Sequence, residues 1–470
     1  MIRNLLILSI YFFISTIMTV QAADIVYPKS NDVKINSAKT FFIGSETSGN
    51  PLSINGETVN VHKSGGFYHV VNLNIGKNTF VIDNGNPKEK KTYTIIRPNV
   101  KYVSNDAKYI AYDTPKLYKT NTDNVPLRAF PNENGLNRLQ HLQNGILLNI
   151  IGEQGNYYKV KLARDDYAWI EKKYLSIEDQ ADYTPAIIQS YEYEETSTYK
   201  RFAIKLDKKV PFILSENRIF NVLEQKYEPF AKGLDLTLYN VNDVPENKYE
   251  LHIINESYLY GYSVDYNDSN ELVITVKKLP KISKSYPLKG INITLDPGHG
   301  GSEYGAIGCL GDKEKDVNLA IALKTKEALE KAGANVFITR ADDSDISLYD
   351  RVKYSQEKNS DVFISIHSNA LPDSLADSNR SGTSVYYFYP QSNNLARVIQ
   401  NTMVKNLRMN DDKVRQESFA VIRNHESLSV LIEVGYMIVP EDNAKLIDPE
   451  FQTKAANAIV KGLEKYFSEI

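Results

Sequence analysis

Cysteine is almost absent from this sequence, with Cys309 the only one in 470 residues. A single cysteine cannot build an internal disulfide framework, so stability must come from buried apolar side chains and from any bound metal. Strong charge of either sign is also missing, because 55 basic residues face 58 acidic ones and the formal net charge is −3. A near-neutral chain argues against nucleic-acid binding, which favours strongly basic surfaces.

Long hydrophobic runs are confined to the N-terminus. Arg3 precedes an apolar run over residues 5–18, and Val20-Gln-Ala22 ends in a small residue. This order is typical of a secretory signal, whereas a spanning helix needs ~20 apolar residues. We predict that residues 1–23 are a signal peptide and that the chain is exported to the periplasm, the cell wall or the outside. An uncleaved membrane anchor is the alternative.

The length is too great for one hydrophobic core, since domains of ~100–200 residues predict three or four units here. Tryptophan is scarce, with one residue against 32 tyrosines, which fits tyrosine-rich β domains. Short runs such as Arg201-Phe-Ala-Ile-Lys-Leu206 alternate at period two, as half-buried strands do. We predict three small all-β modules at residues 24–98, 110–180 and 184–280. A basic, proline-containing linker is expected at residues 281–290.

Each β module resembles a known type of domain. The first resembles the immunoglobulin-like sandwiches of bacterial surface proteins through Ile54-Asn-Gly-Glu-Thr-Val59 and Leu73-Asn-Ile-Gly-Lys-Asn78, and we interpret it as a spacer. The second resembles the bacterial Src-homology-3-like (SH3-like) barrel through Val125-Pro-Leu-Arg128, Tyr157-Tyr-Lys-Val160 and Ala168-Trp-Ile170. Such modules often bind cell-wall peptides, and Trp169 is expected in the core. The third loosely resembles β domains that target envelope amidases to the murein layer.

After residue 290 the pattern changes to strands that alternate with helices. Strands are expected at 291–295, 335–339, 361–366, 383–389 and 429–434, and helices at 315–331, 346–358, 392–408 and 450–467. This alternation predicts that residues 291–470 form an α/β domain, with a mostly parallel sheet flanked by helices on both faces.

Four side chains that could bind a metal or transfer a proton are expected at one edge of that sheet. His299, His367 and Glu433 each follow or end a strand, and Glu314 stands just before a helix. Ligands of open α/β sheets bind outside the carboxyl ends of the strands. Two imidazoles and a carboxylate suit a catalytic zinc with a fourth position for water, and a further carboxylate can move the proton of that water. The spacing alone leaves open that the histidines cap turns and the glutamates are solvated.

Around these residues the chain resembles the zinc-dependent N-acetylmuramoyl-L-alanine amidases, over residues ~291–467. The resemblance depends on ordered motifs that include Asp296-Pro-Gly-His-Gly-Gly301, Glu314-Lys-Asp-Val-Asn-Leu319, Thr339-Arg340, Asp350-Arg351, Ser365-Ile-His-Ser-Asn369 and Leu431-Ile-Glu-Val-Gly-Tyr436. It implies one Zn²⁺ held by His299, Glu314 and His367, with Glu433 as the catalytic carboxylate.

Two further residues near these motifs are candidate substrate contacts. Asn369 could position substrate or orient His367, or it could cap a turn. Arg423 could hold a substrate carboxylate bidentately, or it could be structural. Cys309 lies between the first two candidate ligands and is expected to be an uncharged thiol rather than a zinc ligand.

The resemblance predicts a peptidoglycan hydrolase that cleaves the amide between N-acetylmuramic acid and L-alanine, with Glu433 as general base. The alternatives are a zinc peptidase that acts on stem peptides and a non-catalytic wall-binding protein. We expect a monomer whose partners are peptidoglycan and envelope or division proteins, with no nucleic acid. The β modules would raise the local concentration of the enzyme at the wall.

Overall fold

The computed structural model describes residues 23–47, 49–86, 89–99, 107–178, 183–221, 226–242, 244–255, 258–376 and 378–470. The signal peptide predicted at residues 1–23 lies outside these ranges except for Ala23. That residue is buried in the core of the first β domain. Within the described ranges, no helix combines the length and the apolar character that a membrane crossing requires.

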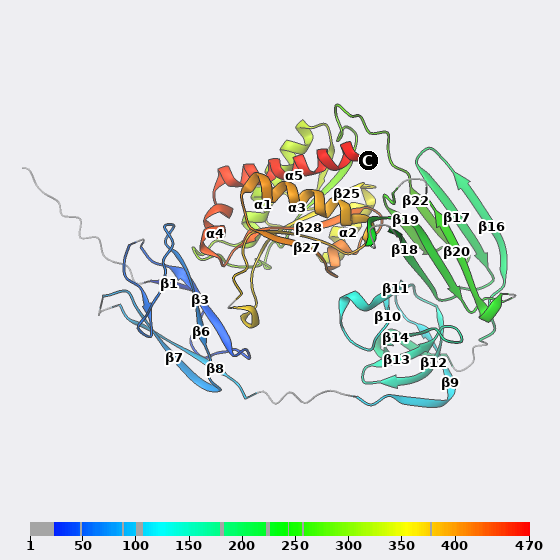
Figure 1. Ribbon diagram of the computed structural model, residues 1–470. Helices are drawn as coiled ribbons and strands as arrows, with labels where there is room; N and C mark the ends of the chain where they lie inside the picture. The colour runs from blue at the N-terminus through cyan, green and yellow to red at the C-terminus, as the bar shows by residue number, and fades with distance from the viewer. Residues whose placement is uncertain are drawn as a thin grey trace, which may run out of the picture.

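The first β domain (residues 23–99) consists of two sheets packed face to face (Figure 1). Large apolar side chains fill the space between them, and the rings of Phe42 and Phe80 lie 5.4 Å apart. One sheet has the order β1 (Asp24–Tyr27), β3 (Lys39–Ser45), β6 (Gly66–Asn72). The other has the order β2 (Val33–Lys34), β8 (Lys91–Arg97), β7 (Gly76–Asp83), β4 (Ser53–Ile54), β5 (Glu57–Thr58).

The second β domain (residues 107–178) is one seven-stranded sheet. Its strand order is β11 (Arg138–Leu142), β10 (Val125–Arg128), β14 (Tyr167–Glu171), β13 (Tyr157–Lys161), β12 (Leu147–Gln154), β9 (Ile110–Thr120), β15 (Leu175–Ile177). Ala168 and Ile170 point into the core, so the residue between them must point outward. The expectation that Trp169 is a core residue was therefore wrong, and it packs against Tyr109 at 6.0 Å.

The third β domain (residues 183–277) contains two antiparallel sheets. They are ordered β16 (Ile188–Glu195), β17 (Tyr199–Leu206), β22 (Glu271–Lys277), β21 (Tyr262–Tyr266), and β18 (Phe212–Asn221), β19 (Lys226–Tyr239), β20 (Lys248–Ile254). Its buried side chains join those of the second β domain in one continuous apolar cluster. These two domains consequently share a core.

The α/β domain (residues 291–470) is built on a six-stranded sheet. The order is β24 (Asn335–Ile338), β23 (Asn292–Pro297), β25 (Val362–Asn369), β28 (Leu428–Tyr436), β26 (Thr383–Tyr387), β27 (Asp411–Gln416). Every neighbouring pair runs parallel except β26 and β28, which are antiparallel. The sequence pattern missed β27 because its residues are mostly polar.

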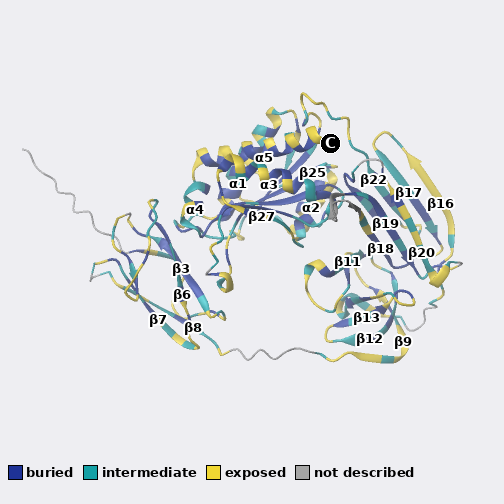
Figure 2. Ribbon diagram, in the orientation of Figure 1, coloured by how far each residue is buried: buried dark blue, intermediate teal, exposed yellow. Residues whose placement is uncertain are grey.

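Helices cover the two faces of this sheet. α1 (Glu314–Lys331), α3 (Asn393–Leu407) and α5 (Pro449–Glu469) lie together on one face, where Ile364 packs beneath them (Figure 1). On the other face, Phe363 and Leu431 pack with Val352 of α2 (Leu348–Glu357). The short α4 (Pro440–Leu446) follows β28. Figure 2 shows the result, with buried strands between helices whose outer faces are exposed.

The segment expected as a linker at residues 281–290 packs against the α/β domain. Leu288 is fully buried in the core of that domain, next to Ile291. Lys277, just before the segment, donates to the Ser360 carbonyl at 3.0 Å. The connection between the third β domain and the α/β domain is thus fixed in place by burial of an apolar side chain.

Candidate metal centre

His299 stands on a strained turn directly after β23. Its φ is +61°, a left-handed conformation that a side chain with a Cβ rarely adopts. Two buried arginines hold the backbone of this turn. Arg340 donates to the Pro297 and Gly298 carbonyls at 3.0 and 2.9 Å, and Arg351 donates to the His299 carbonyl at 2.8 Å. The turn therefore presents the imidazole at the carboxyl end of the sheet.

Glu314 is the first residue of α1, and its carboxylate is buried among hydrogen-bond donors. The Ala306 backbone N–H donates to Oε2 at 2.8 Å. The Ser368 backbone N–H and the Asn318 side chain both donate to Oε1 at 3.1 Å. Because both oxygens are held, the carboxylate has one fixed orientation toward the histidines.

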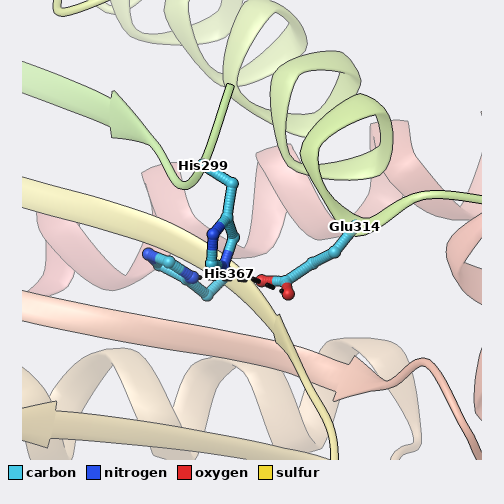
Figure 3. Close-up of side chains that lie close together, drawn as sticks. All are labelled: His299, Glu314 and His367. Carbon is cyan, nitrogen blue, oxygen red and sulfur yellow. Dashed lines mark hydrogen bonds and ion pairs between the residues drawn. The ribbon is translucent and has the colours of Figure 1, made fainter. Parts of the chain in front are cut away.

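The three side chains converge on one point (Figure 3). Nε2 of His299 lies 3.2 Å from Oε2 of Glu314, and Nδ1 of His367 lies 3.0 Å from Oε1. One candidate ligand atom from each residue lies within 4.8 Å of the other two. Burial by itself raises the pKa of the Glu314 carboxyl, but hydrogen bonds from the two imidazoles outweigh it and hold the pKa far below its usual range.

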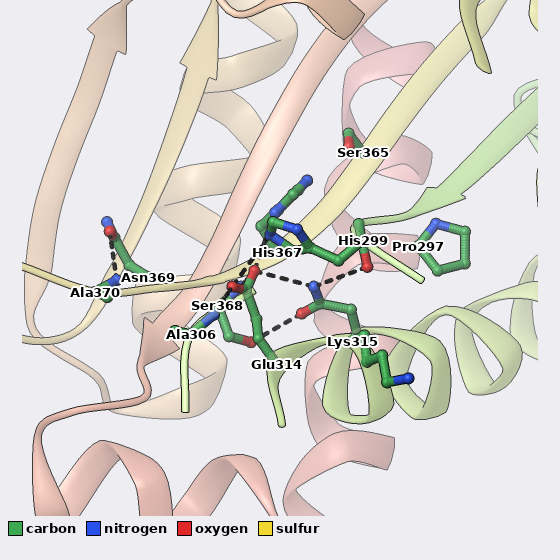
Figure 4. Close-up of polar contacts among 12 residues, drawn as sticks. Pro297, His299, Ala306, Glu314, Lys315, Ser365, His367, Ser368, Asn369 and Ala370 are labelled. Atoms are coloured by element: carbon green, nitrogen blue, oxygen red, sulfur yellow. Dashed lines mark hydrogen bonds and ion pairs between the residues drawn. The ribbon is translucent and has the colours of Figure 1, made fainter. Parts of the chain in front are cut away.

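Such a donor set fits a zinc ion. Zinc accepts imidazole nitrogens and carboxylate oxygens, and three protein ligands leave a position for water or substrate. The site also has the supporting contacts that orient metal ligands, since Ser368 donates to the Oδ1 atom of Asn318 at 3.1 Å and thereby fixes the amide next to Glu314. Ser368 is labelled in Figure 4. Neither Ser368 nor Asn318 was predicted as a site residue.

Glu433 lies on β28 beside His367 of β25, its register partner across the two parallel strands. Its Oε2 atom is buried and makes no hydrogen bond with any residue that the structure describes. Burial, and next the nearby negative charge of Glu314, raise the pKa of the Glu433 carboxyl well above its usual value. A carboxyl of this kind readily takes up a proton and can later release it.

The two candidate substrate contacts are not part of the cluster. Oδ1 of Asn369 accepts a hydrogen bond from the Ala370 backbone N–H at 2.8 Å, and its side chain points away from His367 in Figure 4. Arg423 donates to the Ser418 carbonyl at 2.6 Å, near the second β domain. Burial lowers the pKa of its guanidinium to about 10. Both substrate roles remain predictions.

Cys309 is buried away from the ligand atoms. Its Sγ atom donates to the Ile438 carbonyl at 3.2 Å, and burial raises the pKa of the thiol to about 12. The thiol is therefore uncharged at neutral pH, as the sequence analysis expected.

The α/β domain is similar in sequence to several known proteins. Residues 293–465 match the family described as N-acetylmuramoyl-L-alanine amidase. A probable cell wall amidase of Staphylococcus epidermidis, LytH, is 38% identical over 186 residues, which are 39% of this chain and 61% of LytH. The uncharacterized protein YqiI of Bacillus subtilis is 36% identical over 194 residues, which are 40% of this chain and 91% of YqiI.

Among solved structures, the N-acetylmuramoyl-L-alanine amidase AmiC2 of Nostoc punctiforme is 35% identical, with 40% of this chain and 98% of that chain covered at a TM-score of 0.35. The match to LytH spans about three fifths of the length of that protein, or 61%. The family match falls within the α/β domain and leaves the three β domains outside it.

Proposed function

The chain belongs to the N-acetylmuramoyl-L-alanine amidase family, which it matches over residues 293–465, and on this premise we propose that it is a peptidoglycan hydrolase. The bond cleaved is the amide that joins the lactyl group of N-acetylmuramic acid to the L-alanine of the stem peptide. The observation that carries the proposal is the convergence of His299, Glu314 and His367 beside Glu433, whose buried Oε2 has no hydrogen bond to the described part of the chain.

His299, Glu314 and His367 would hold one zinc ion. When bound, zinc supplies a Lewis acid that polarises a carbonyl and makes water nucleophilic near neutral pH. The protein itself orients the side chains that would bind the metal. Hydrogen bonds from Ala306 and Ser368 fix the Glu314 carboxylate, so little reorganisation is needed when the metal enters.

Glu433 moves the proton. As a water molecule attacks the lactyl carbonyl carbon, Oε2 of Glu433 takes one of its protons. The protonated Glu433 then delivers the proton to the L-alanine nitrogen while the carbon–nitrogen bond breaks. The products are a lactyl carboxylate on the sugar and a stem peptide with a free amino terminus, so one water is consumed.

The experiment is digestion of purified muropeptides, followed by mass spectrometry of the products. The proposal predicts intact stem peptides that begin with L-alanine. Shortened peptides still joined to the sugar would instead indicate a zinc peptidase, and no product at all would indicate a wall-binding protein. Glu433→Gln should lower the rate by about 100-fold or more, the range of general acid–base catalysis, while zinc content stays at one per chain.

A matched control is Glu357→Gln, which removes the charge of an exposed glutamate at the end of α2. This variant should digest muropeptides at the wild-type rate. If Glu433→Gln retained full activity, the mechanism would be wrong even though the family assignment stands.

The β domains would attach the enzyme to the cell wall. We propose module boundaries at residues 24–98, 110–180 and 184–280, with the second module SH3-like, and export of the chain to the cell envelope or beyond. Attachment through these modules would raise the effective concentration of the α/β domain near its substrate. Measured retention of the chain on purified sacculi, compared with that of an unrelated exported protein, checks this attachment.

A further inference from the structure

Two hollows adjoin the metal centre, and different domains line them. One has a volume of about 350 Å³ and is lined by the α/β domain alone, with Glu303, Asp345 and Ser347 among its polar groups. The other has a volume of about 210 Å³ and lies between the α/β domain and the first β domain. Its walls are mostly apolar, with Val26 and Phe41 contributed by the first β domain. We call it the interdomain hollow.

A buried contact fixes the first β domain against the α/β domain. Phe41 of β3 packs with Cys309 and Ile438 in one apolar cluster that includes side chains of both domains. At its edge, the Tyr27 hydroxyl donates to the Asp373 carboxylate at 3.0 Å. The first β domain is therefore held beside the metal centre, and the interpretation that it is a spacer does not describe this contact.

The floor of the interdomain hollow is the loop that holds a candidate metal ligand. Ala306 lines the hollow, and its backbone N–H is the donor to Oε2 of Glu314. Gly305 lines it too, with φ at +69° and no room for a side chain, because a Cβ there would clash with Glu314 and lie 2.6 Å from Cδ2 of His299. The interdomain hollow and the metal centre therefore share one loop, with Glu314 and His299 in contact with its backbone.

Among the described residues that line the interdomain hollow, Lys29 of the first β domain is the only charged one. Its ammonium group donates to the Tyr304 hydroxyl and lies 4.5 Å from the centroid of the Tyr304 ring. Tyr304 directly precedes the loop at the floor, so this cation is held at the rim by the domain opposite. An exposed ammonium group positioned in this way attracts anions.

Apolar surface forms most of the wall in both hollows, and they differ in their charged groups, since Glu303 and Asp345 line one and Lys29 lines the other. Sugar hydroxyls need polar partners, which the hollow with Glu303, Asp345 and Ser347 provides. A peptide that begins with alanine places a methyl group next to the scissile bond, and its following residues carry carboxylates. Apolar walls with one cation at the rim suit that peptide.

We propose that the interdomain hollow binds the peptide half of the substrate and that Lys29 pairs with a stem-peptide carboxylate. This inference depends on the proposed amidase function. It makes the first β domain part of the substrate site, and it makes Lys29 a specificity-determining residue that lies outside the family's own domain.

The test is steady-state kinetics with the full chain on two muramoyl peptides. They differ only in the second peptide residue, which is glutamate with a free α-carboxylate in one and the corresponding carboxamide in the other. Lys29→Ala should raise KM for the carboxylate substrate by about fivefold, the upper range for an exposed ion pair, and should remove the preference for it. Lys29→Glu should reverse that preference.

Lys77→Ala serves as the matched control, because Lys77 is an exposed lysine on β7 of the same domain and does not line the hollow. It should behave as wild type. If the wild type releases stem peptide but Lys29→Ala keeps the same KM values and the same preference, this inference is overturned and the amidase function stands. If the wild type releases no stem peptide, the proposed function fails first.

Discussion

Replacing Arg351 with alanine should destabilise the turn that carries His299. Arg351 pairs with Asp296 at 2.7 Å, and the two side chains are only 4% and 1% exposed. The same guanidinium donates to the Pro297 and His299 carbonyls, both at 2.8 Å. These bonds restrain a histidine whose left-handed backbone costs about 1–3 kcal/mol, so their loss allows the turn to relax.

The magnitude follows from the burial of the ion pair. Removal of one partner from a buried pair costs about 3–5 kcal/mol, because the other charge stays buried without compensation. The hydroxyls of Thr339 and Ser365 still donate to Asp296 at 2.7 and 2.8 Å. We therefore expect the lower limit, about 3 kcal/mol. For a domain of this size, each kcal/mol lowers Tm by about 2–4 °C, which gives a fall of roughly 6–12 °C.

The assay combines calorimetry with zinc analysis. Arg351→Ala should show the lower Tm and should lose zinc to a competing chelator at concentrations that leave the wild type loaded. Arg397→Ala is the matched control, since Arg397 is exposed in the middle of α3. A variant at Arg351 with unchanged Tm and unchanged zinc retention would refute the view that this arginine holds the metal-binding turn.

Three further predictions concern the contacts between domains. Cys309 is buried and its pKa is raised to about 12, so thiol reagents at pH 8 should label the native chain far more slowly than the denatured chain; equal rates would contradict its burial. Asp373→Asn weakens the hydrogen bond from Tyr27, by about 1–3 kcal/mol, and should speed labelling of Cys309; an unchanged rate would argue against this docking contact. Burial and the positive Arg423 lower the pKa of His141 from 6.5 to about 3. The unfolded chain then binds one more proton between these values, so stability should fall by about 1.4 kcal/mol for each pH unit of acidification in that window. In denaturant unfolding at pH 7 and pH 5, His141→Gln should reduce this dependence, and an identical dependence would contradict the assignment.

The helices of the α/β domain were predictable because their signals are local. The pattern predicted a helix over residues 315–331 and a closing helix over 450–467, and the structure has Glu314–Lys331 and Pro449–Glu469. Two elements were missed for physical reasons. The polar edge strand β27 exists through its pairing with β26, and the seven-residue helix α4 is too short to show a period.

The metal centre was predictable in part, because side chains at the ends of parallel strands meet at one edge. His299, Glu314 and His367 do converge there. Asn318 could have been found from its spacing of four residues after Glu314 on the same helix. No local pattern reveals the contact of Lys29 with Tyr304, since 275 residues separate them in the chain.

The core shared by the second and third β domains has a practical consequence for dissecting the protein. The side chain of Gln143, in the second domain, accepts a hydrogen bond from the Tyr266 backbone N–H at 2.8 Å, across the boundary. A recombinant fragment that ends between the two domains would expose apolar side chains on both halves and would tend to aggregate. Residues 107–277 should instead be expressed as one piece, so that the shared core stays intact.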